Sequence, residues 1–160
     1  YLTWNRPMLM QYLYDFDREY KRGHNLITEK YGRMEESTTP EEYARIKDNF
    51  PEIDEEKKRV IEGIVSIQVK WMEEFSEKYP HLAGNARSIR TAADELYDTS
   101  YETYLRGEIS TYSDKMLQLY GQHVVQCVAN GVNIAKETIS NTARLYGYED
   151  LEKFEAGILE

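Results

Sequence analysis

Glu108 is the carboxylate in this sequence whose position most suggests chemistry. It lies in residues 99–113, TSYETYLRGEISTYS, on one helical stripe with Tyr101, Tyr104 and Tyr112, at spacings of three and four. A carboxylate that faces a core needs a hydrogen-bonding partner or a raised pKa. The sequence therefore favours a bonded structural carboxylate and leaves open a ligand-binding or catalytic role.

Two arginines, and hydroxyl groups within residues 3–46, are the candidate partners of Glu108. Arg87 and Arg90 fall in residues 81–93, which the sequence predicts to be one long irregular segment, and such segments often carry function. They could bind an anion or pair with neighbouring carboxylates. We take five residues as candidate ligand-binding groups and assign no catalytic residue: Glu108, Tyr101, Tyr104, Arg87 and Arg90.

The residue types that usually hold cofactors lack the required spacing. His24, His81 and His123 have no Glu-x-x-His, His-x-His or Cys-x-x-Cys partner, so we expect no metal site. There is no glycine-rich phosphate loop, and we expect no cofactor. The single cysteine, Cys127, lies on an apolar helical face. It predicts an inert core thiol and a reducing, cytoplasmic compartment.

Charge and length limit the class of protein. The chain of 160 residues fits one domain, and 41% of its residues are hydrophobic. Its net charge of −9 argues against binding to nucleic acid or to an anionic membrane through a basic face. No run approaches the ~20 apolar residues of a membrane span. Fourteen tyrosines suit a core edge or an interface.

Apolar spacing and capping residues predict an all-α fold. The longest helix should begin at Asp54 and end near Tyr79. Thr99 with Glu102, and Thr39 with Glu42, have the spacing of capping boxes at helix starts. Gly107 lies in the middle of a helix, where a close approach from another element would explain it. The first helix should bury a face that contains Leu9, Tyr12, Leu13, Phe16 and Tyr20.

An internal repeat organises these helices. Seven identical pairs occur at a fixed offset of 108 residues within residues 3–30: Thr3/Thr111, Met8/Met116, Leu9/Leu117, Tyr12/Tyr120, Gly23/Gly131, Asn25/Asn133 and Glu29/Glu137. Gly23 and Gly131 should end helices in the left-handed conformation, and Asn25 and Asn133 should cap the next ones. We predict a multi-helix bundle in which two repeated hairpins, 3–46 and 111–154, flank a central segment, 54–110.

Three of these stretches resemble an uncharacterised bacterial domain-of-unknown-function family. They are TSYETYLRGEISTYS, NLITEKY and LYGYEDLE, and the resemblance covers nearly the whole chain. It implies a further N-terminal segment with a helix and a cysteine-containing Gly-Gly-Arg-type loop. The repeat also leads us to expect such a segment before Tyr1. The resemblance implies no known activity.

Two functions compete at this point. The first is a non-catalytic helical module that binds a partner protein or a small molecule, because catalytic signatures are missing and tyrosines are many. The alternative is an enzyme with a polar site between the two repeats, near Glu108, Tyr101 and Arg87. We also expect that part of the first hairpin is left exposed or is covered by a second chain, so a homodimer is one possible arrangement.

Overall fold

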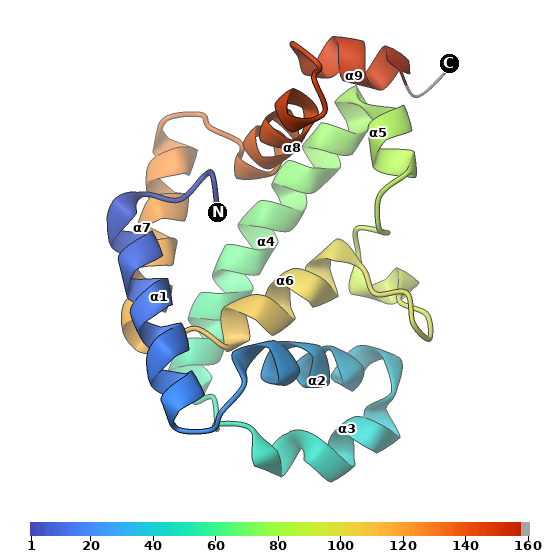
Figure 1. Ribbon diagram of the computed structural model, residues 1–160. Helices are drawn as coiled ribbons and strands as arrows, with labels where there is room; N and C mark the ends of the chain where they lie inside the picture. Colours follow the sequence, from blue (N-terminus) through green and yellow to red (C-terminus); the bar gives the residue numbers. More distant parts are fainter. Residues whose placement is uncertain (158–160) are drawn as a thin grey trace.

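The fold is entirely α-helical over residues 1–157, which are the residues that the computed structural model describes (Figure 1). No β-strand occurs within this range, so the predicted fold class is confirmed. The helices are α1 (Arg6–Lys21), α2 (Leu26–Thr38), α3 (Pro40–Ile46), α4 (Glu55–Lys78), α5 (Pro80–Gly84), α6 (Tyr101–Ser110), α7 (Asp114–Ala129), α8 (Ile134–Leu145) and α9 (Leu151–Gly157). Short 3-10 turns occupy residues 47–49 and 91–93.

Helix α4 forms the centre of the molecule, as its length predicts. Asp54 caps it by accepting a hydrogen bond from the Lys57 amide. Helices α5, α6, α7 and α8 all contact α4. Its buried side chains meet those of α6 to α8 in one core, which includes Ile61, Ile64, Val65, Val69, Trp71, Met72, Phe75, Ile109, Met116, Leu117, Val124 and Ile134. This core fixes the positions of α4 and α6, and these two helices form one wall of the cleft described below.

Helices α1 and α7 lie side by side and run in opposite directions (Figure 1). The Ser113 hydroxyl, at the start of α7, donates to the buried carboxylate of Asp15 at 2.5 Å. Trp4, which precedes α1, packs against four tyrosine rings at centroid distances of 4.8–6.1 Å: Tyr1, Tyr12, Tyr112 and Tyr120. The N-terminal segment is thus attached to both helices through aromatic side chains.

The two hairpins have helices of matching position. The bounds of α1 and α7 differ by 108 residues at both ends, and α2 and α8 also start 108 residues apart. Gly23 and Gly131 have φ values of 77° and 65°, and the side chains of Asn25 and Asn133 cap α2 and α8. These turns have the geometry that glycine permits. The agreement supports the repeat, and duplication remains our interpretation of it.

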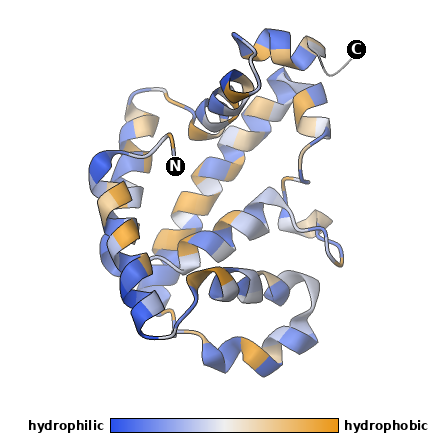
Figure 2. Ribbon diagram, viewed as in Figure 1, coloured by the Kyte–Doolittle hydropathy of each residue, from blue (hydrophilic) through white to orange (hydrophobic). Residues whose placement is uncertain are grey.

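The buried face of α1 differs from the predicted one. Met8 and Asp15 are its buried residues, whereas Leu9, Leu13 and Tyr20 are 40%, 63% and 76% exposed. Helix α1 meets the rest of the molecule through the side that holds Met8, Tyr12 and Asp15. Of the predicted face, Tyr12 and Phe16 are half-buried, and the other three residues face solvent. Figure 2 accordingly shows hydrophobic residues on this outer helix as well as on α4.

Two predicted capping boxes are wrong. Ser100, not Thr99, caps α6, and its hydroxyl accepts from the Thr103 amide. Glu102 instead accepts a hydrogen bond from the Thr91 amide. Thr39 precedes α3 but makes no side-chain capping bond. In both cases a threonine has the spacing of a capping box, but its hydroxyl makes no capping hydrogen bond.

Residues 81–93 are less irregular than predicted. They include most of α5 and the 3-10 turn at 91–93. The segment that follows closes a tight turn in which Glu95 and Asp98 exchange two backbone hydrogen bonds of 2.9 and 3.0 Å. The α5 helix forms because Pro80 fits its first position and Glu155 accepts from the amides of His81 and Leu82.

Candidate functional site

Glu108 is a bonded carboxylate at the contact between α6 and the first hairpin. The Lys30 ammonium on α2 donates to Glu108 Oε2 at 2.6 Å, and the Tyr112 hydroxyl donates to Oε1 at 3.3 Å. The Lys30 and Glu108 side chains are 12% and 22% exposed. The expected partners were loop arginines or first-hairpin hydroxyls. The first hairpin does supply the partner, but it is a lysine.

Tyr104 and Arg87 continue this row of side chains. The Lys30 Nζ lies 3.6 Å from the centroid of the Tyr104 ring, and the Arg87 guanidinium carbon lies 5.1 Å from it. Burial alone would lower the pKa of Lys30, but its interactions with Glu108 and Tyr104 outweigh burial and raise that pKa. Lys30 is therefore a fixed cation between a carboxylate and an aromatic ring.

The other two candidate residues lie apart from this row. Burial raises the pKa of the Tyr101 hydroxyl, and its ring packs against the main core. The Arg90 Nε donates to Glu73 on α4 at 2.7 Å, on the surface. Arg87 itself donates to the carbonyl and hydroxyl oxygens of Thr99 at 3.0 and 2.9 Å. The structure thus joins Glu108 to Tyr104 through Lys30 and places Arg87 against Tyr104, but it does not bring Tyr101 or Arg90 to them.

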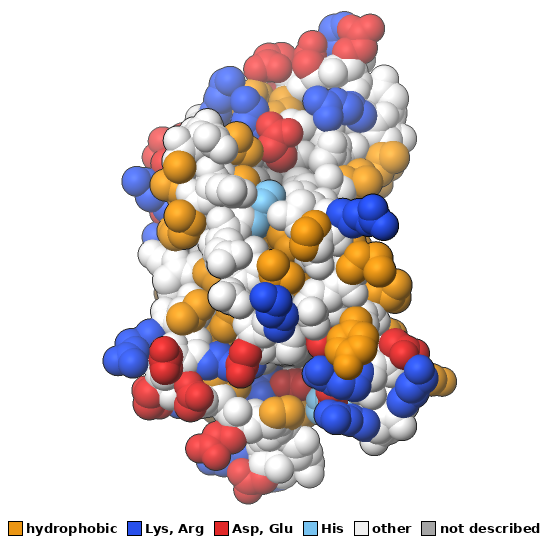
Figure 3. Space-filling model, turned by 90° about the vertical axis from the view of Figure 1, so that its left-hand side faces the viewer, with side chains coloured by type: hydrophobic (Ala, Val, Ile, Leu, Met, Phe, Trp, Pro, Cys, Tyr) orange, Lys and Arg blue, Asp and Glu red, His pale blue; other side chains and the backbone are white. Residues whose placement is uncertain are grey.

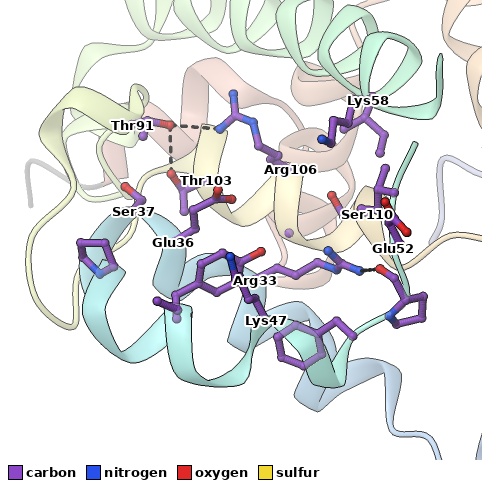
Figure 4. A pocket seen from close by; sticks show the side chains of 18 of the residues that line it. Arg33, Glu36, Ser37, Lys47, Glu52, Lys58, Thr91, Thr103, Arg106 and Ser110 are labelled. Carbon is purple, nitrogen blue, oxygen red and sulfur yellow. Dashed lines mark hydrogen bonds between the residues drawn. The ribbon is translucent and has the colours of Figure 1, made fainter. Parts of the chain in front are cut away.

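A large cleft lies on a different side of α6, between α2 and α3 on one side and the start of α4 with α6 on the other (Figure 4). Its volume is about 1220 Å³. The lining includes basic, acidic, hydroxyl and apolar side chains, among them Arg33, Lys47, Lys58, Arg106, Glu36, Asp48, Glu52, Glu62, Ser37, Thr103, Tyr43, Phe50, Ile53 and Ile61. The sequence patterns did not predict this cleft, because its walls come from four separate segments.

Two glycines shape the cleft by allowing close contacts. A Cβ atom on Gly107 would lie 2.8 Å from Met34 Cγ and 3.0 Å from the Lys30 carbonyl oxygen, so α6 can approach α2 only through a glycine. This explains the mid-helix glycine as predicted. A Cβ on Gly32 would lie 2.3 Å from the Phe50 ring, which rests on the α2 backbone. Phe50 thereby brings the segment after α3 to the edge of the cleft.

The arginines of the cleft are held in place by carboxylates. Arg33 donates to the buried Glu29 at 2.7 Å and to the Pro51 carbonyl oxygen at 2.7 Å, so it connects α2 to the segment before α4. Arg106 makes a bidentate contact with Glu62 on α4, at 2.7 and 3.0 Å. Such planar pairs fix guanidinium groups in one orientation. The walls of the cleft are therefore rigid where these arginines lie.

Asp94 ties the end of the cleft together. Its carboxylate accepts from the hydroxyls of Ser37 and Thr103 at 2.5 and 2.6 Å, and from the Ser100 amide at 2.6 Å. Burial alone would raise the pKa of Asp94, but these hydrogen bonds outweigh it and hold that pKa below its usual value. Burial alone would also raise the pKa of Glu102, but the hydrogen bonds from the Thr91 amide and from Arg106 outweigh it, so that pKa is lowered as well. Both carboxylates suit fixed anions better than general acids.

The described residues include neither a cluster of metal ligands nor an activated thiol. No group of three or more His, Cys, Asp or Glu side chains in residues 1–157 could hold a metal ion. The Cys127 thiol lies 3.8 Å from His123 Nε2, and burial raises its pKa, which makes it a poor nucleophile. No helix among these residues is long and apolar enough to cross a membrane.

These features define an all-helical domain with an open cleft of mixed charge. A family model described as "Protein of unknown function (DUF4125)" matches residues 1–156, and the chain belongs to this family. The resemblance inferred from the three sequence stretches is thereby confirmed at the level of the family. Searches of curated proteins and of solved structures gave no match.

Proposed function

We propose that this protein is a non-catalytic binding module and that the cleft between α2–α3 and α4–α6 holds an extended segment of a partner protein. The observation that carries the proposal is the cleft itself, with its volume of about 1220 Å³ and its mixed lining. Binding sites for small molecules are usually clefts or cavities of about 300–1,000 Å³, so this space is large for a small molecule.

The distribution of charge supports a polypeptide ligand. Four basic side chains, Arg33, Lys47, Lys58 and Arg106, share the lining with four acidic ones, Glu36, Asp48, Glu52 and Glu62. An anion site would concentrate one sign of charge, whereas this lining carries both signs, and Lys47 and Glu36 make no ion pair within residues 1–157. Apolar surface from Phe50, Ile53 and Ile61 lies among the charges. Such a mixture suits a chain that presents acidic, basic and apolar side chains in turn.

The ion pairs in the walls support binding without chemistry. Arg33 and Arg106 are oriented before any ligand enters, so the site loses little side-chain entropy on binding. Glu108, the carboxylate that we considered for catalysis, lies outside the cleft lining and has both oxygens bonded. These contacts weigh against an acid–base site at that residue.

A single substitution that fills the cleft tests the proposal. Ala44 is exposed on α3 and lines the cleft, so Ala44→Trp places an indole there. Peptides that bind the wild-type protein are selected from a random phage-displayed library, and their affinities are measured by fluorescence anisotropy. We expect Ala44→Trp to weaken them by about tenfold or more, because a bulky side chain excludes the ligand.

Ala129→Trp provides the matched control, because Ala129 is an exposed helical alanine on α7 that does not line the cleft. It should leave peptide affinity unchanged. Equal binding of the selected peptides to wild type and Ala44→Trp would contradict the proposed site. If the library yields no binder and a metabolite binds the wild type but not Ala44→Trp, the ligand of the cleft is a small molecule and not a peptide.

A further inference from the structure

The outer face of α1 carries an apolar patch that the described residues leave uncovered. Leu9, Met10, Leu13 and Tyr14 are 40%, 56%, 63% and 61% exposed. They occupy positions i, i+1, i+4 and i+5 of one helix, so their side chains adjoin on its surface. Figure 3, which views the side of the molecule that holds α1 and α7, shows such hydrophobic side chains between charged groups. We call these four residues the α1 patch.

One basic and one acidic residue flank the α1 patch symmetrically. Arg6 comes three residues before Leu9, and Asp17 comes three residues after Tyr14. Arg6 and Asp17 are 11 residues apart, about three helical turns, so both lie on the same exposed face as the patch. Arg6 makes no ion pair within residues 1–157, and Asp17 pairs only with the exposed Lys21 on its own helix. Both charges are accessible to another molecule.

The order of these side chains along α1 allows two copies of the helix to pack antiparallel with complementary residues opposite one another. If two α1 helices pack antiparallel about a two-fold axis that crosses the α1 patch midway along it, Leu9 meets Tyr14 of the second copy and Met10 meets Leu13. The same register sets Arg6 opposite Asp17 of the second copy, and symmetry repeats each pair. An antiparallel pair also places opposite helix dipole ends together.

The near-neutral charge of α1 distinguishes it from the rest of this acidic chain. The protein carries a net charge of −9, which would repel a second copy at most surfaces. Residues 1–22 contain four basic and three acidic side chains, so this segment is close to neutral. Two copies can therefore approach through α1 without a large electrostatic cost.

We propose that the α1 patch is a homodimer interface in which two α1 helices pack antiparallel, with Arg6 of each copy paired to Asp17 of the other. The patch is small compared with the ~800 Å² per partner of a standard interface. The dimer should therefore be weak and form reversibly in the micromolar range. This proposal does not depend on the cleft or on its ligand.

Sedimentation equilibrium of the 160-residue chain, from low to high micromolar concentration, tests it. The wild type should pass from monomer to dimer. Leu13→Glu should remain monomeric, because it buries a carboxylate at the centre of the patch. Val125→Glu is the control: Val125 is 64% exposed on α7. It should dimerise like wild type. Circular dichroism checks that each variant is folded.

A charge exchange tests the register. Arg6→Asp and Asp17→Arg should each weaken dimerisation by about tenfold, since each places like charges opposite one another twice. The double variant should recover most of the lost affinity, because the pairs form again with reversed sign. A merely structural role for either residue would not produce this recovery.

Three results would overturn the proposal: a wild type that stays monomeric at high micromolar concentration, equal loss of dimer in Leu13→Glu and Val125→Glu, or a double variant no stronger than the single ones. The first result would exclude a second copy of the chain as the occupant of the α1 patch. The second would place the dimer contact elsewhere, and the third would exclude the antiparallel register.

Discussion

Replacing Gly107 by alanine should separate helix propensity from packing, because this glycine lies where α6 crosses α2. Alanine in the middle of a helix is favoured over glycine by about 1 kcal/mol. At Gly107, however, the new Cβ would lie 2.8 Å from Met34 Cγ and 3.0 Å from the Lys30 carbonyl oxygen. The methionine side chain can move, but the carbonyl belongs to the α2 backbone, so the two helices must separate.

Forcing an extra methyl group into a packed contact costs about 1–3 kcal/mol. After the gain in helix propensity is subtracted, Gly107→Ala should destabilise the protein by about 1 kcal/mol. Gly63→Ala is the matched control, because Gly63 lies within α4 and a Cβ there would meet no atom within 4 Å. That variant should be more stable than wild type by about 1 kcal/mol.

Urea denaturation followed by circular dichroism measures both free energies of unfolding. The sign difference between the two variants is the critical result, since both substitutions have the same effect on the unfolded chain. If Gly107→Ala stabilises the protein as much as Gly63→Ala does, then α6 does not approach α2 as closely as described. Our account of why a glycine occurs there would then be incorrect.

Two further predictions concern a turn and a hydrogen-bonded carboxylate. Gly131→Ala should lose about 1 kcal/mol of stability in urea, since its φ of 65° strains an L-residue although no atom lies within 4 Å of the new Cβ; an unchanged denaturation midpoint would contradict this. Asp94→Asn should destabilise the protein at neutral pH, and its difference from wild type should shrink as the pH falls below about 4. The pKa of Asp94 is lower in the folded than in the unfolded state, so its stabilisation is present above the ordinary value of 3.8 and is lost as the pH falls through the folded pKa. Urea midpoints measured between pH 7 and 3 check this, and a constant difference would refute the role given to the Ser37 and Thr103 bonds.

Local sequence patterns were sufficient to predict the all-α fold, the long central helix and the two glycine turns. Asp54, Asn25 and Asn133 cap helices as expected, since a capping bond joins residues two or three positions apart and needs no distant partner. The glycine turns follow from the same short-range geometry. Ser100 shows the limit: Thr99 and Ser100 are both good capping residues, and the choice between them depends on how the preceding loop packs.

The candidate site was harder to predict because its contacts are long-range. Lys30 and Glu108 are 78 positions apart, and nothing in either local pattern relates them. The contact with α2 also gives α6 two buried sides. Thr103 and Gly107 are fully buried in addition to Ile109, while Tyr104 and Glu108 are only partly covered. A single apolar stripe could therefore not identify which face of α6 lines the cleft.

The aromatic packing around Trp4 gives the protein a built-in optical reporter. Tyr12, Tyr112 and Tyr120 all have ring centroids within 6.1 Å of the indole, and they belong to α1, the turn between α6 and α7, and α7. Tyrosine emission overlaps tryptophan absorption, so energy transfer to Trp4 must be efficient while these segments remain together. In a Trp71→Phe variant, which leaves Trp4 as the single indole, the excitation spectrum thus reports detachment of the N-terminal helix with no label added.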